Sequence, residues 1–270
     1  MNIVESKKVG ELIREWRGRR RLSQLDLAYD AEISPKHLSF LETGRSQPSR
    51  EMILRLAGQM EIPLREQNVL LTAAGFASVF PERSFGDESL AAANRAVDLI
   101  LTGLEPNPAF AVDRYWTLVK ANKAVGILLS EVDSSLLEPP VNILRLCLHP
   151  KGFAPQIINH SEWRKNVLEY LDRQVEITAD VFLMELVQEL KSYPKLKSFR
   201  SSLPPKAIDY SRFAIPLRLM TKEGELSFIS TITVFGTPVD VTLAELAIES
   251  FFPADESTAE ILRRVYQEQK

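Results

Sequence analysis

The amino-acid sequence predicts an α+β protein with two domains. Apolar residues recur at three- and four-residue spacing through residues 7–74, which is the pattern of short amphipathic helices. That periodicity is lost in FASVFPERSFGDE, where Pro, Gly and Ser gather. Farther along, IPLRLMT and ELSFISTITVF alternate in polarity around a Lys-Glu-Gly turn, which predicts a β-hairpin. We therefore expect an all-α N-terminal domain, a linker, and a C-terminal domain that combines an antiparallel sheet with helices.

Five helices are expected in the N-terminal domain, residues 1–75. The first has apolar residues at positions 9, 12, 13 and 16 and ends in a basic run. Ser23 is the expected N-cap of the second helix, QLDLAYDAEI, and Ser34 caps the third, with Pro35 at its first position. Gly44 ends the third helix. The fourth and fifth helices are REMILRLAGQM and LREQNVLLTAAG.

The linker is expected over residues 76–87 and the C-terminal domain over residues 88–270. PAFAVDR and YWTLVKAN read as two short strands around a tight turn, and AELAIESFF as a last strand or a short helix. Helices are expected in ESLAAANRAVDLILTGL, from Lys123 onward, in SEWRKNVLEYLDRQVEI, in DVFLMELVQELKSY and in DESTAEILRRVYQEQK, where Asp255 is the N-cap.

Composition limits the class of protein. The chain of 270 residues is 45% hydrophobic and 26% charged, which is typical of soluble globular proteins. MNIVESKKVG lacks the apolar core of a secretory signal, and the longest uncharged run, Leu226 to Val239, is too short to span a membrane. The single cysteine, Cys147, excludes an internal disulfide and fits a reducing compartment. We expect a cytoplasmic protein without membrane contact.

Charge is unevenly distributed along the chain. The net charge is −3, yet residues 7–50 contain 10 Lys and Arg against 6 Asp and Glu. A local basic patch is compatible with nucleic-acid binding. Charge alone, however, is more typical of an ordinary solvent-exposed helix face. The assignment of nucleic-acid binding therefore depends on the sequence motif of the second and third helices.

The second and third helices are joined by a short turn around residues 32–34. Ala28 falls where the two helices come closest, and Ile33, Leu38 and Leu41 fall on buried positions. The segment QLDLAYDAEISPKHLSFLETGR resembles the helix-turn-helix of Xre and lambdoid-phage repressors, including the Leu-Glu-x-Gly-(Lys/Arg) that follows the recognition helix. The resemblance implies binding to double-stranded DNA. A helical module that binds protein instead of DNA is the alternative.

In such domains the N-terminal residues of the third helix meet base edges in the major groove. Lys36 can donate to a guanine and Phe40 can contact a thymine methyl group. The start of the second helix and the loop after the third are expected to follow phosphates. The predicted DNA-contacting residues are Ser23, Gln24, Ser34, Pro35, Lys36, His37, Ser39, Phe40, Thr43, Arg45, Ser46 and Arg50.

One position departs from this pattern. Glu32 stands in the turn where Gly is usual, and a left-handed backbone costs a non-Gly residue on the order of 1–2 kcal/mol. The turn, and with it the angle of the third helix, is therefore expected to differ slightly.

The C-terminal domain shows no catalytic pattern. The three histidines form no HExxH motif, and the sequence has no Cys pair, GxGxxG after a strand, P-loop or GxSxG. We therefore expect no enzyme, no metal site and no required cofactor.

A second resemblance covers nearly the whole chain. HLSFLETGRSQPSREMILRLA, LHPKGFAP, NHSEWR and GELSFISTITVFGTPVDVTLAELAIESFFPAD are similar to the MmyB-like regulators. This family joins an Xre-type head to a ligand-binding domain with a PAS-like fold. It implies a five-stranded antiparallel sheet with strands near 109–113, 115–120, 214–222, 225–236 and 244–252 and covering helices. A family member is known to hold a fatty-acid-like molecule, so the resemblance implies an apolar or amphiphilic effector.

The strand at 225–236 mixes apolar bulk with hydroxyls on both faces, so either face can line a cavity, and a solid core is the alternative. AFAVDRYWTLVKANKA looks like the opening hairpin of a PAS domain, with Asn122 before a helix. Arg145 and His149 are candidates for an acidic head group. The predicted ligand-binding residues are Asn122, Arg145, His149, Trp163, Phe228, Ser230, Thr231, Thr233 and Phe235.

Together these features predict a one-component transcription factor with a small-molecule sensor. A homodimer is expected because one small head buries too little surface for tight specific DNA binding. Two alternatives remain for the C-terminal domain: an adaptor that binds another protein without a small ligand, and an enzyme.

Overall fold

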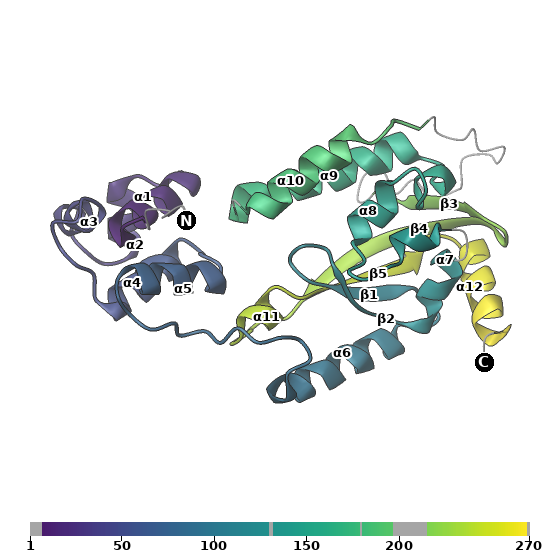
Figure 1. Ribbon diagram of the computed structural model, residues 1–270, viewed down its shortest axis with the longest axis horizontal. Helices are drawn as coiled ribbons and strands as arrows, with labels where there is room; N and C mark the ends of the chain where they lie inside the picture. Colours follow the sequence, from purple (N-terminus) through teal and green to yellow (C-terminus); the bar gives the residue numbers. More distant parts are fainter. Residues whose placement is uncertain (1–6, 130–131, 179, 197–214, 269–270) are drawn as a thin grey trace. The chain divides into compact units, whose positions relative to one another are not determined.

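The computed structural model describes residues 7–129, 132–178, 180–196 and 215–268. The chain divides into two compact units (Figure 1). Unit 1 comprises residues 1–83 and 237–244, and unit 2 comprises residues 84–236 and 245–270. No helix in the described residues combines the length and the apolar character needed to cross a membrane.

Unit 1 is built from five α-helices around one apolar core, as the periodicity predicts. The side chains of Ile13, Leu27, Leu38, Ile53 and Leu71 meet in this core, and all of them are fully buried. The helices are α1 (Val9–Arg19), α2 (Gln24–Asp30), α3 (Pro35–Glu42), α4 (Arg50–Gln59) and α5 (Leu64–Ala73).

Serine N-caps begin three of these helices. The hydroxyls of Ser23, Ser34 and Ser49 each accept a hydrogen bond from the backbone N–H three residues farther on. These bonds satisfy donors that have no partner inside the helix. The predicted starts of α2, α3 and α4 are thereby confirmed.

Two further segments complete unit 1. The side chain of Asn68 on α5 accepts hydrogen bonds from the backbone of Val79 and Phe80, which ties down the chain after α5. The distant segment 237–244 contains the short helix α11 (Val241–Ala244), which lies beside α5. Val241 N–H donates to the carbonyl of Pro81 at 2.9 Å. The first unit boundary therefore falls inside the predicted linker, and residues 237–244 group with unit 1 although the sequence placed them in the C-terminal domain.

Unit 2 contains one antiparallel five-stranded sheet in the order β2-β1-β5-β4-β3. The strands are β1 (Ala109–Val112), β2 (Leu118–Ala121), β3 (Leu217–Thr221), β4 (Gly224–Val234) and β5 (Ala247–Pro253). The helices are α6 (Ala91–Gly103), α7 (Gly126–Leu129), α8 (Ile143–Leu148), α9 (His160–Thr178), α10 (Val181–Ser192) and α12 (Glu256–Glu268). Short 3-10 turns lie at Glu88–Leu90, Lys123–Val125, Ser134–Leu136 and Ala154–Gln156.

Helices cover both faces of this sheet. Side chains of α8, α9 and α10 join those of β1, β3, β4 and β5 in the main core of unit 2. Figure 1 shows α8, α9 and α10 together over one side of the sheet, with α6 on the other. The α6 residues Val97 and Leu101 pack with Ala109, Ala111 and Ile248 in a separate, smaller cluster.

The strand bounds differ from the predicted ones at two places. The second strand was predicted from residue 115 but begins at Leu118, because the Asp113 carboxylate accepts hydrogen bonds from the N–H groups of Tyr115 and Thr117 and closes a turn. Trp116 takes a positive φ of 63° in that turn. The segment AELAIESFF is also divided, with helix α11 ending at Ala244 before β5 begins. The predicted start of the third strand, residue 214, lies outside the described residues.

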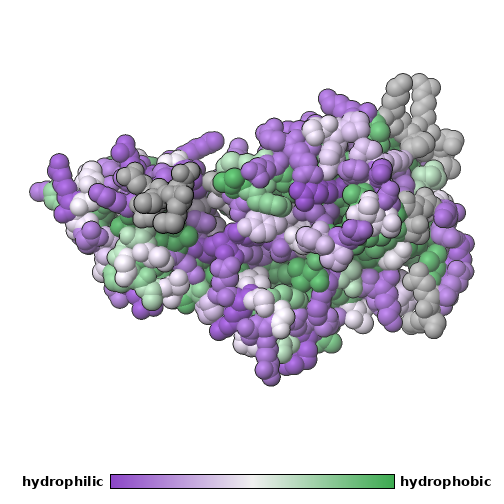
Figure 2. Space-filling model, viewed as in Figure 1, coloured by the Kyte–Doolittle hydropathy of each residue, from purple (hydrophilic) through white to green (hydrophobic). Residues whose placement is uncertain are grey.

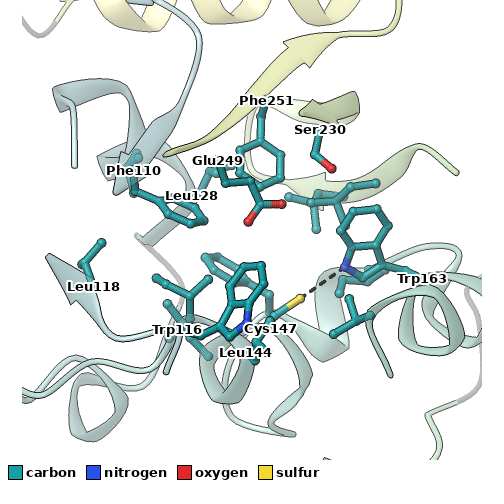
Figure 3. A pocket seen from close by; sticks show the side chains of 18 of the residues that line it. Phe110, Trp116, Leu118, Leu128, Leu144, Cys147, Trp163, Ser230, Glu249 and Phe251 are labelled. Carbon is teal, nitrogen blue, oxygen red and sulfur yellow. Dashed lines mark hydrogen bonds between the residues drawn. The ribbon is translucent and has the colours of Figure 1, made fainter. Parts of the chain in front are cut away.

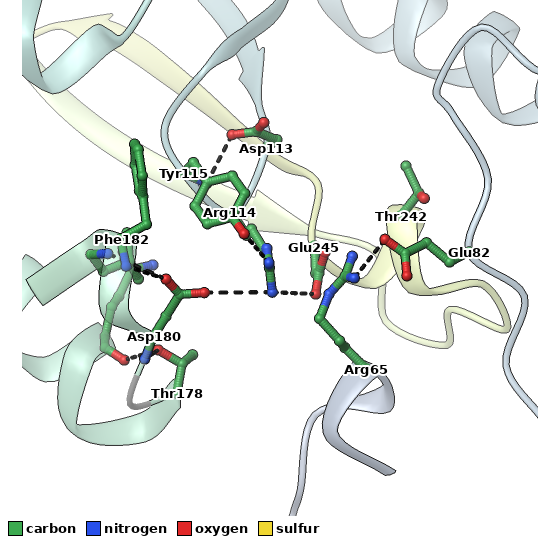
Figure 4. A network of polar contacts seen from close by, with 12 residues as sticks. Arg65, Glu82, Asp113, Arg114, Tyr115, Thr178, Asp180, Phe182, Thr242 and Glu245 are labelled. Carbon is green, nitrogen blue, oxygen red and sulfur yellow. Dashed lines mark hydrogen bonds and ion pairs between the residues drawn. The ribbon is translucent and has the colours of Figure 1, made fainter. Parts of the chain in front are cut away.

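Arg114 joins three parts of unit 2 (Figure 4). Its guanidinium lies 3.5 Å from Asp180, which caps α10, and 3.6 Å from Glu245, just before β5. It also stacks on the ring of Tyr115. The turn between β1 and β2 is therefore fixed to the start of α10 and to the entry of β5.

Candidate functional site

Helices α2 and α3 form the predicted helix-turn-helix. Ala28 is fully buried at their contact, and Leu38 and Leu41 point inward. Glu32 takes a φ of 55°, so the turn adopts the left-handed backbone although the residue is not Gly. The expected deviation of this turn is therefore not observed: the left-handed conformation stays at Glu32, and Ile33 N–H reaches back to the carbonyl of Ala28 at 2.9 Å.

The Glu of the Leu-Glu-x-Gly motif holds three helices together. Glu42 is buried, and its carboxylate accepts hydrogen bonds from Arg17 Nε at 2.6 Å and from Gln24 Nε2 at 2.7 Å. Gly10 lets α1 approach α3, because a Cβ there would lie 2.3 Å from the carbonyl oxygen of Leu41. The orientation of α3 is thus set from α1 and α2. The amide of Gln24, predicted to meet a phosphate, already donates to Glu42.

The start of α3 and the loop after it present polar and basic side chains to solvent. Lys36 Nζ and the Arg45 guanidinium lie 5.7 and 5.8 Å from the ring centroid of Phe40. Ser39, Phe40 and Ser46 are half-buried, while Ser34, Pro35, Lys36, His37, Thr43, Arg45 and Arg50 are exposed. Hydrophilic residues also predominate over the α3 end of unit 1 in Figure 2. This surface can meet phosphates and base edges.

Three hydroxyls in this set already have local partners. Ser23 and Ser34 accept bonds as N-caps, and Thr43 donates to the carbonyl of Ser39 at 2.7 Å. A capping hydroxyl keeps its own proton, so Ser34 can still donate to a phosphate, whereas the side chain of Ser23 also hydrogen-bonds the Asp26 carboxylate.

Unit 2 contains a cavity of about 460 Å³ between the sheet and its helices (Figure 3). Its volume lies within the range of small-molecule sites. The lining is mostly aliphatic and aromatic, and comes from all five strands and from α7, α8 and α9. The lining residues are Phe110, Trp116, Leu118, Val125, Leu128, Leu129, Leu137, Val141, Ile143, Leu144, Leu146, Cys147, Phe153, Ile157, Trp163, Asn166, Val167, Tyr170, Leu217, Leu219, Ser230, Ile232, Glu249 and Phe251.

Few polar groups interrupt this lining. Among the described lining residues only Glu249 carries a formal charge. Burial away from water raises the pKa of Glu249 to about 7, against the opposing effect of a hydrogen bond with Ser230. Burial, and next the charge of Glu249, raises the pKa of Tyr170. The cavity therefore offers one titratable carboxyl in apolar surroundings.

The cysteine of the cavity is not suited to covalent chemistry. Burial raises the pKa of Cys147 to about 12, and its Sγ accepts a hydrogen bond from Trp163 Nε1 at 3.3 Å. Because the thiolate is the nucleophile, such a thiol is unreactive near neutral pH. In the part of the chain that the structure describes, no cluster of His, Cys, Asp and Glu can hold a metal ion.

Of the predicted ligand-binding residues, Trp163 and Ser230 line the cavity. Phe228 shares the strand face of Ser230 but is fully buried in the core. Thr231 and Thr233 are exposed on the opposite face of β4, and Phe235 packs with the cluster around α6. The cavity face of β4 is therefore the one with Ser230 and Ile232.

The other three predicted residues are engaged outside the cavity. Asn122 accepts from Ala109 N–H and donates to the carbonyls of Leu101 and Asn107. Arg145 forms a bidentate pair with Glu189 on α10, with a shortest distance of 2.7 Å. His149 Nδ1 accepts from the backbone N–H of Lys151. These contacts give Asn122, Arg145 and His149 structural roles, and none of them lines the cavity.

The sequence interpretation missed Glu249, Trp116 and Tyr170. For Glu249 a signal was present, because AIESFF places one acidic residue inside an otherwise apolar strand. Trp116 and Tyr170 reach the cavity only through the turn at residues 113–117 and the packing of α9. Neither of these is visible in a local pattern.

Two family models match successive parts of the chain. Residues 8–58 match a helix-turn-helix domain, and residues 93–265 match the MmyB-like transcription regulator ligand binding domain. A comparison with curated proteins finds no match.

Among the solved structures that are similar to this chain are two of one gene regulator and one of a light receptor. One structure of the clp gene regulator ClgR from C. glutamicum is 30% identical, covering 25% of this chain and 83% of that chain, with a TM-score of 0.22. A second structure of ClgR, from Corynebacterium glutamicum, is 23% identical, covering 36% and 90%, with a TM-score of 0.22. An RNA-binding light-oxygen-voltage receptor is 9% identical, covering 98% and 64%, with a TM-score of 0.30.

The helix-turn-helix with its exposed basic surface and the matched ligand-binding domain occur in one chain. The protein is therefore a DNA-binding transcription regulator that belongs to the family with an MmyB-like ligand-binding domain.

Proposed function

We propose that this regulator binds, in the cavity of unit 2, a slender small molecule with a fatty-acid-like hydrocarbon tail, and that the ligand changes its binding to an operator. The observation that supports this is the cavity itself, with its apolar lining and about 460 Å³ of space. Burying a hydrocarbon chain contributes roughly 0.8 kcal/mol per CH₂ group. A tail of about ten carbons offsets the cost of association and leaves micromolar affinity.

The operator is double-stranded DNA, read by α3. Lys36 and His37 stand at the exposed start of that helix, and the half-buried Phe40 lies one turn farther on. All three are proposed to meet base edges. Arg45 and Arg50 lie beyond it and are proposed to meet phosphates. DNA as the partner also fits a cytoplasmic location.

A ligand can act only through its different affinity for two states of the protein. The strands β4 and β5 supply Ser230, Ile232, Glu249 and Phe251 to the cavity. The same two strands are joined by segment 237–244, which groups with unit 1. The chain therefore runs directly from the cavity wall into the DNA-binding unit, and a ligand that moves β4 or β5 changes the position of that segment.

The regulator is proposed to act as a homodimer. A single head of this size buries little DNA surface, and two heads on half-sites one helical turn apart, about 34 Å, give tight specific binding. Sedimentation of the protein, free and on DNA, tests this. A monomer under both conditions contradicts it.

The sensor role is tested on the full chain with two measurements. Mass spectrometry of the denatured, purified protein is expected to release a small amphiphile with a hydrocarbon tail. Decan-1-ol is expected to raise the melting temperature of unit 2 and to change the affinity for DNA from upstream of the protein's own gene. If no lipid is released and decan-1-ol changes neither quantity, unit 2 is an interaction module without a small ligand.

A further inference from the structure

Glu249 occupies the centre of the cavity wall. On β5 it pairs with Phe110 of β1 on one side and with Ile232 of β4 on the other, and both neighbours line the cavity. The residue is 8% exposed, and Figure 3 shows its carboxyl group directed into the space between the sheet and the helices. A ligand in the cavity therefore meets this carboxyl.

No cation faces it from the lining that the structure describes. The basic residues of the covering helices lie outside that lining; Arg173 on α9 lies over the ring of Tyr170, 5.7 Å from its centroid. Arg145 on α8 is paired with Glu189, and Arg164 on α9 donates to the carbonyls of Leu190 and Lys191. An ionised carboxylate in such surroundings lacks the compensation that buried charges normally have.

Aromatic rings surround the same space. Phe110 and Phe251 lie with their centroids 5.7 Å apart on the sheet side, and Trp116 and Tyr170 lie 5.7 Å apart on the opposite side. Aromatic faces attract cations, most strongly where water is excluded. They give no comparable attraction to an anion, so the rings and the carboxyl favour the same kind of ligand group.

We propose that Glu249 anchors the polar end of the ligand and selects a molecule whose tail ends in a hydrogen-bond-donating cation, a protonated amine. This inference rests on the proposed sensor function and specifies the ligand class. The ammonium group donates to the carboxylate of Glu249 while the hydrocarbon tail extends along the aliphatic lining. A fatty acid offers the same hydrocarbon tail but an anionic end group. Its carboxylate is repelled by the carboxylate of Glu249, so it binds only when one proton is shared between the two carboxyl groups.

The titration of the site agrees with this geometry. Burial raises the pKa of Glu249 to about 7, so the carboxyl is poised between its two forms near neutral pH. The other titratable groups that face it are Tyr170 from α9 and Cys147 from α8, and both have raised pKa values and remain neutral there. The strands β1 and β4 present Phe110, Ser230 and Ile232, which do not titrate. Glu249 is therefore the group that controls the pH dependence of binding.

The test compares three ligands with one tail on the full-length protein: decylamine, decan-1-ol and decanoate. Binding is followed by calorimetry and by the fluorescence of Trp116 and Trp163, which line the cavity. At about pH 8 decylamine is expected to bind about tenfold or more tightly than decanoate. Decylamine affinity is expected to rise between about pH 6 and about pH 8, as Glu249 loses its proton, and decanoate affinity to fall.

Glu249→Gln keeps the shape and removes the charge, and is expected to abolish both the preference for the amine and its pH dependence. Glu169→Gln is the matched control, because Glu169 is an exposed carboxylate on the cavity helix α9 whose partner is Lys165. This control is expected to retain the preference.

The outcomes separate the two proposals. If decan-1-ol binds but decanoate equals or exceeds decylamine at about pH 8, the anchor is wrong and the sensor function stands. The same conclusion follows if the Glu249→Gln variant is folded, as measured by circular dichroism, and still prefers decylamine to decanoate as the parent does. If none of the three ligands binds, both the anchor and the sensor function are wrong.

Discussion

The carboxylate of Glu42 on α3 accepts two hydrogen bonds from Arg17 on α1, from Nε at 2.6 Å and from Nη2 at 3.0 Å. The Glu42 side chain is 1% exposed and that of Arg17 is 16% exposed. Arg17→Ala leaves the carboxylate buried without its cation, and is expected to lower the free energy of unfolding of unit 1 by about 2–4 kcal/mol. Hydrogen exchange of the amides of α1 to α3 measures this.

The control for that variant is Lys7→Ala. Lys7 pairs with Glu15 at 2.7 Å, but both side chains are exposed to water. Losing this pair is expected to cost less than about 1 kcal/mol. Equal effects of the two substitutions would show that the Arg17–Glu42 pair does not hold α1 to α3.

Two glycines of α1 are predicted to respond in opposite directions to the same change. A Cβ on Gly10 lies 2.3 Å from the Leu41 carbonyl oxygen, so Gly10→Ala forces α1 away from α3 and is expected to cost about 1–3 kcal/mol. A Cβ on Gly18 meets nothing within 4 Å, and Gly18→Ala is expected to stabilise unit 1 by about 0.5–1 kcal/mol. Urea unfolding of the two variants compares them. A neutral Gly10→Ala would contradict the close approach of the helices.

Two basic residues beside Phe40 are expected to affect DNA binding differently. Lys36→Ala is expected to weaken binding to the cognate site by about 1–3 kcal/mol and to relax the preference at one or two bases, because Lys36 stands at the start of α3. Arg45→Ala is expected to weaken binding to all sequences alike and to reduce its salt dependence. Fluorescence anisotropy at several salt concentrations separates the two effects. If both variants bind cognate and random DNA like the parent, α3 is not the reading helix.

Glu249 is expected to make unit 2 less stable as the pH rises. Its pKa is raised to about 7 in the folded protein, so the folded state holds its proton more tightly than the unfolded chain does. The resulting stability is complete below the unfolded pKa, near 4.5, and is lost as the pH rises through about 7. Glu249→Gln is therefore expected to match the parent at about pH 5 and to exceed it by up to about 3 kcal/mol at about pH 8. Thermal unfolding without ligand measures the difference, and an equal gain at both pH values would contradict the shift.

Val167 lines the cavity from α9, so substitutions at this residue are expected to change the cavity volume. Val167→Phe is expected to fill part of the space and to weaken binding of decan-1-ol by about tenfold or more, whereas Val167→Ala enlarges the space and keeps the site open to longer alcohols. DNA binding without ligand is expected to stay unchanged in both. Calorimetry with alcohols of increasing length makes the comparison. Identical chain-length profiles would show that the ligand lies elsewhere.

Local signals in the sequence were sufficient for the five helices α1 to α5 of unit 1. Ser23, Ser34 and Ser49 begin helices, Gly44 ends one with a positive φ, and these short-range preferences agree with the tertiary packing. The assignment of Glu32 to the turn was also correct. What the sequence did not indicate is the inward role of Glu42, since its partner Arg17 lies 25 residues away.

The cavity was harder to predict for a physical reason. A strand pattern of period two gives the two faces of β4 but not which face meets the helices, and both faces mix apolar and hydroxyl residues. Arg145 looked available for an acidic ligand because its partner Glu189 lies on another helix, 44 residues away. Whether Ser230 or Thr231 lines the cavity is likewise set by the packing of the sheet against helices that are distant in the sequence.

The segment 237–244 has a consequence for the modularity of this regulator. Asp240 and Val241 are buried, and Asp240 pairs with Arg83 at 3.2 Å within unit 1. A gene fragment that ends at codon 83 would encode an incomplete unit 1, in which α5 lacks its contact with α11. Chimeras that transplant this head onto a foreign sensor must therefore carry residues 237–244 as well, supplied by a hairpin of the new domain.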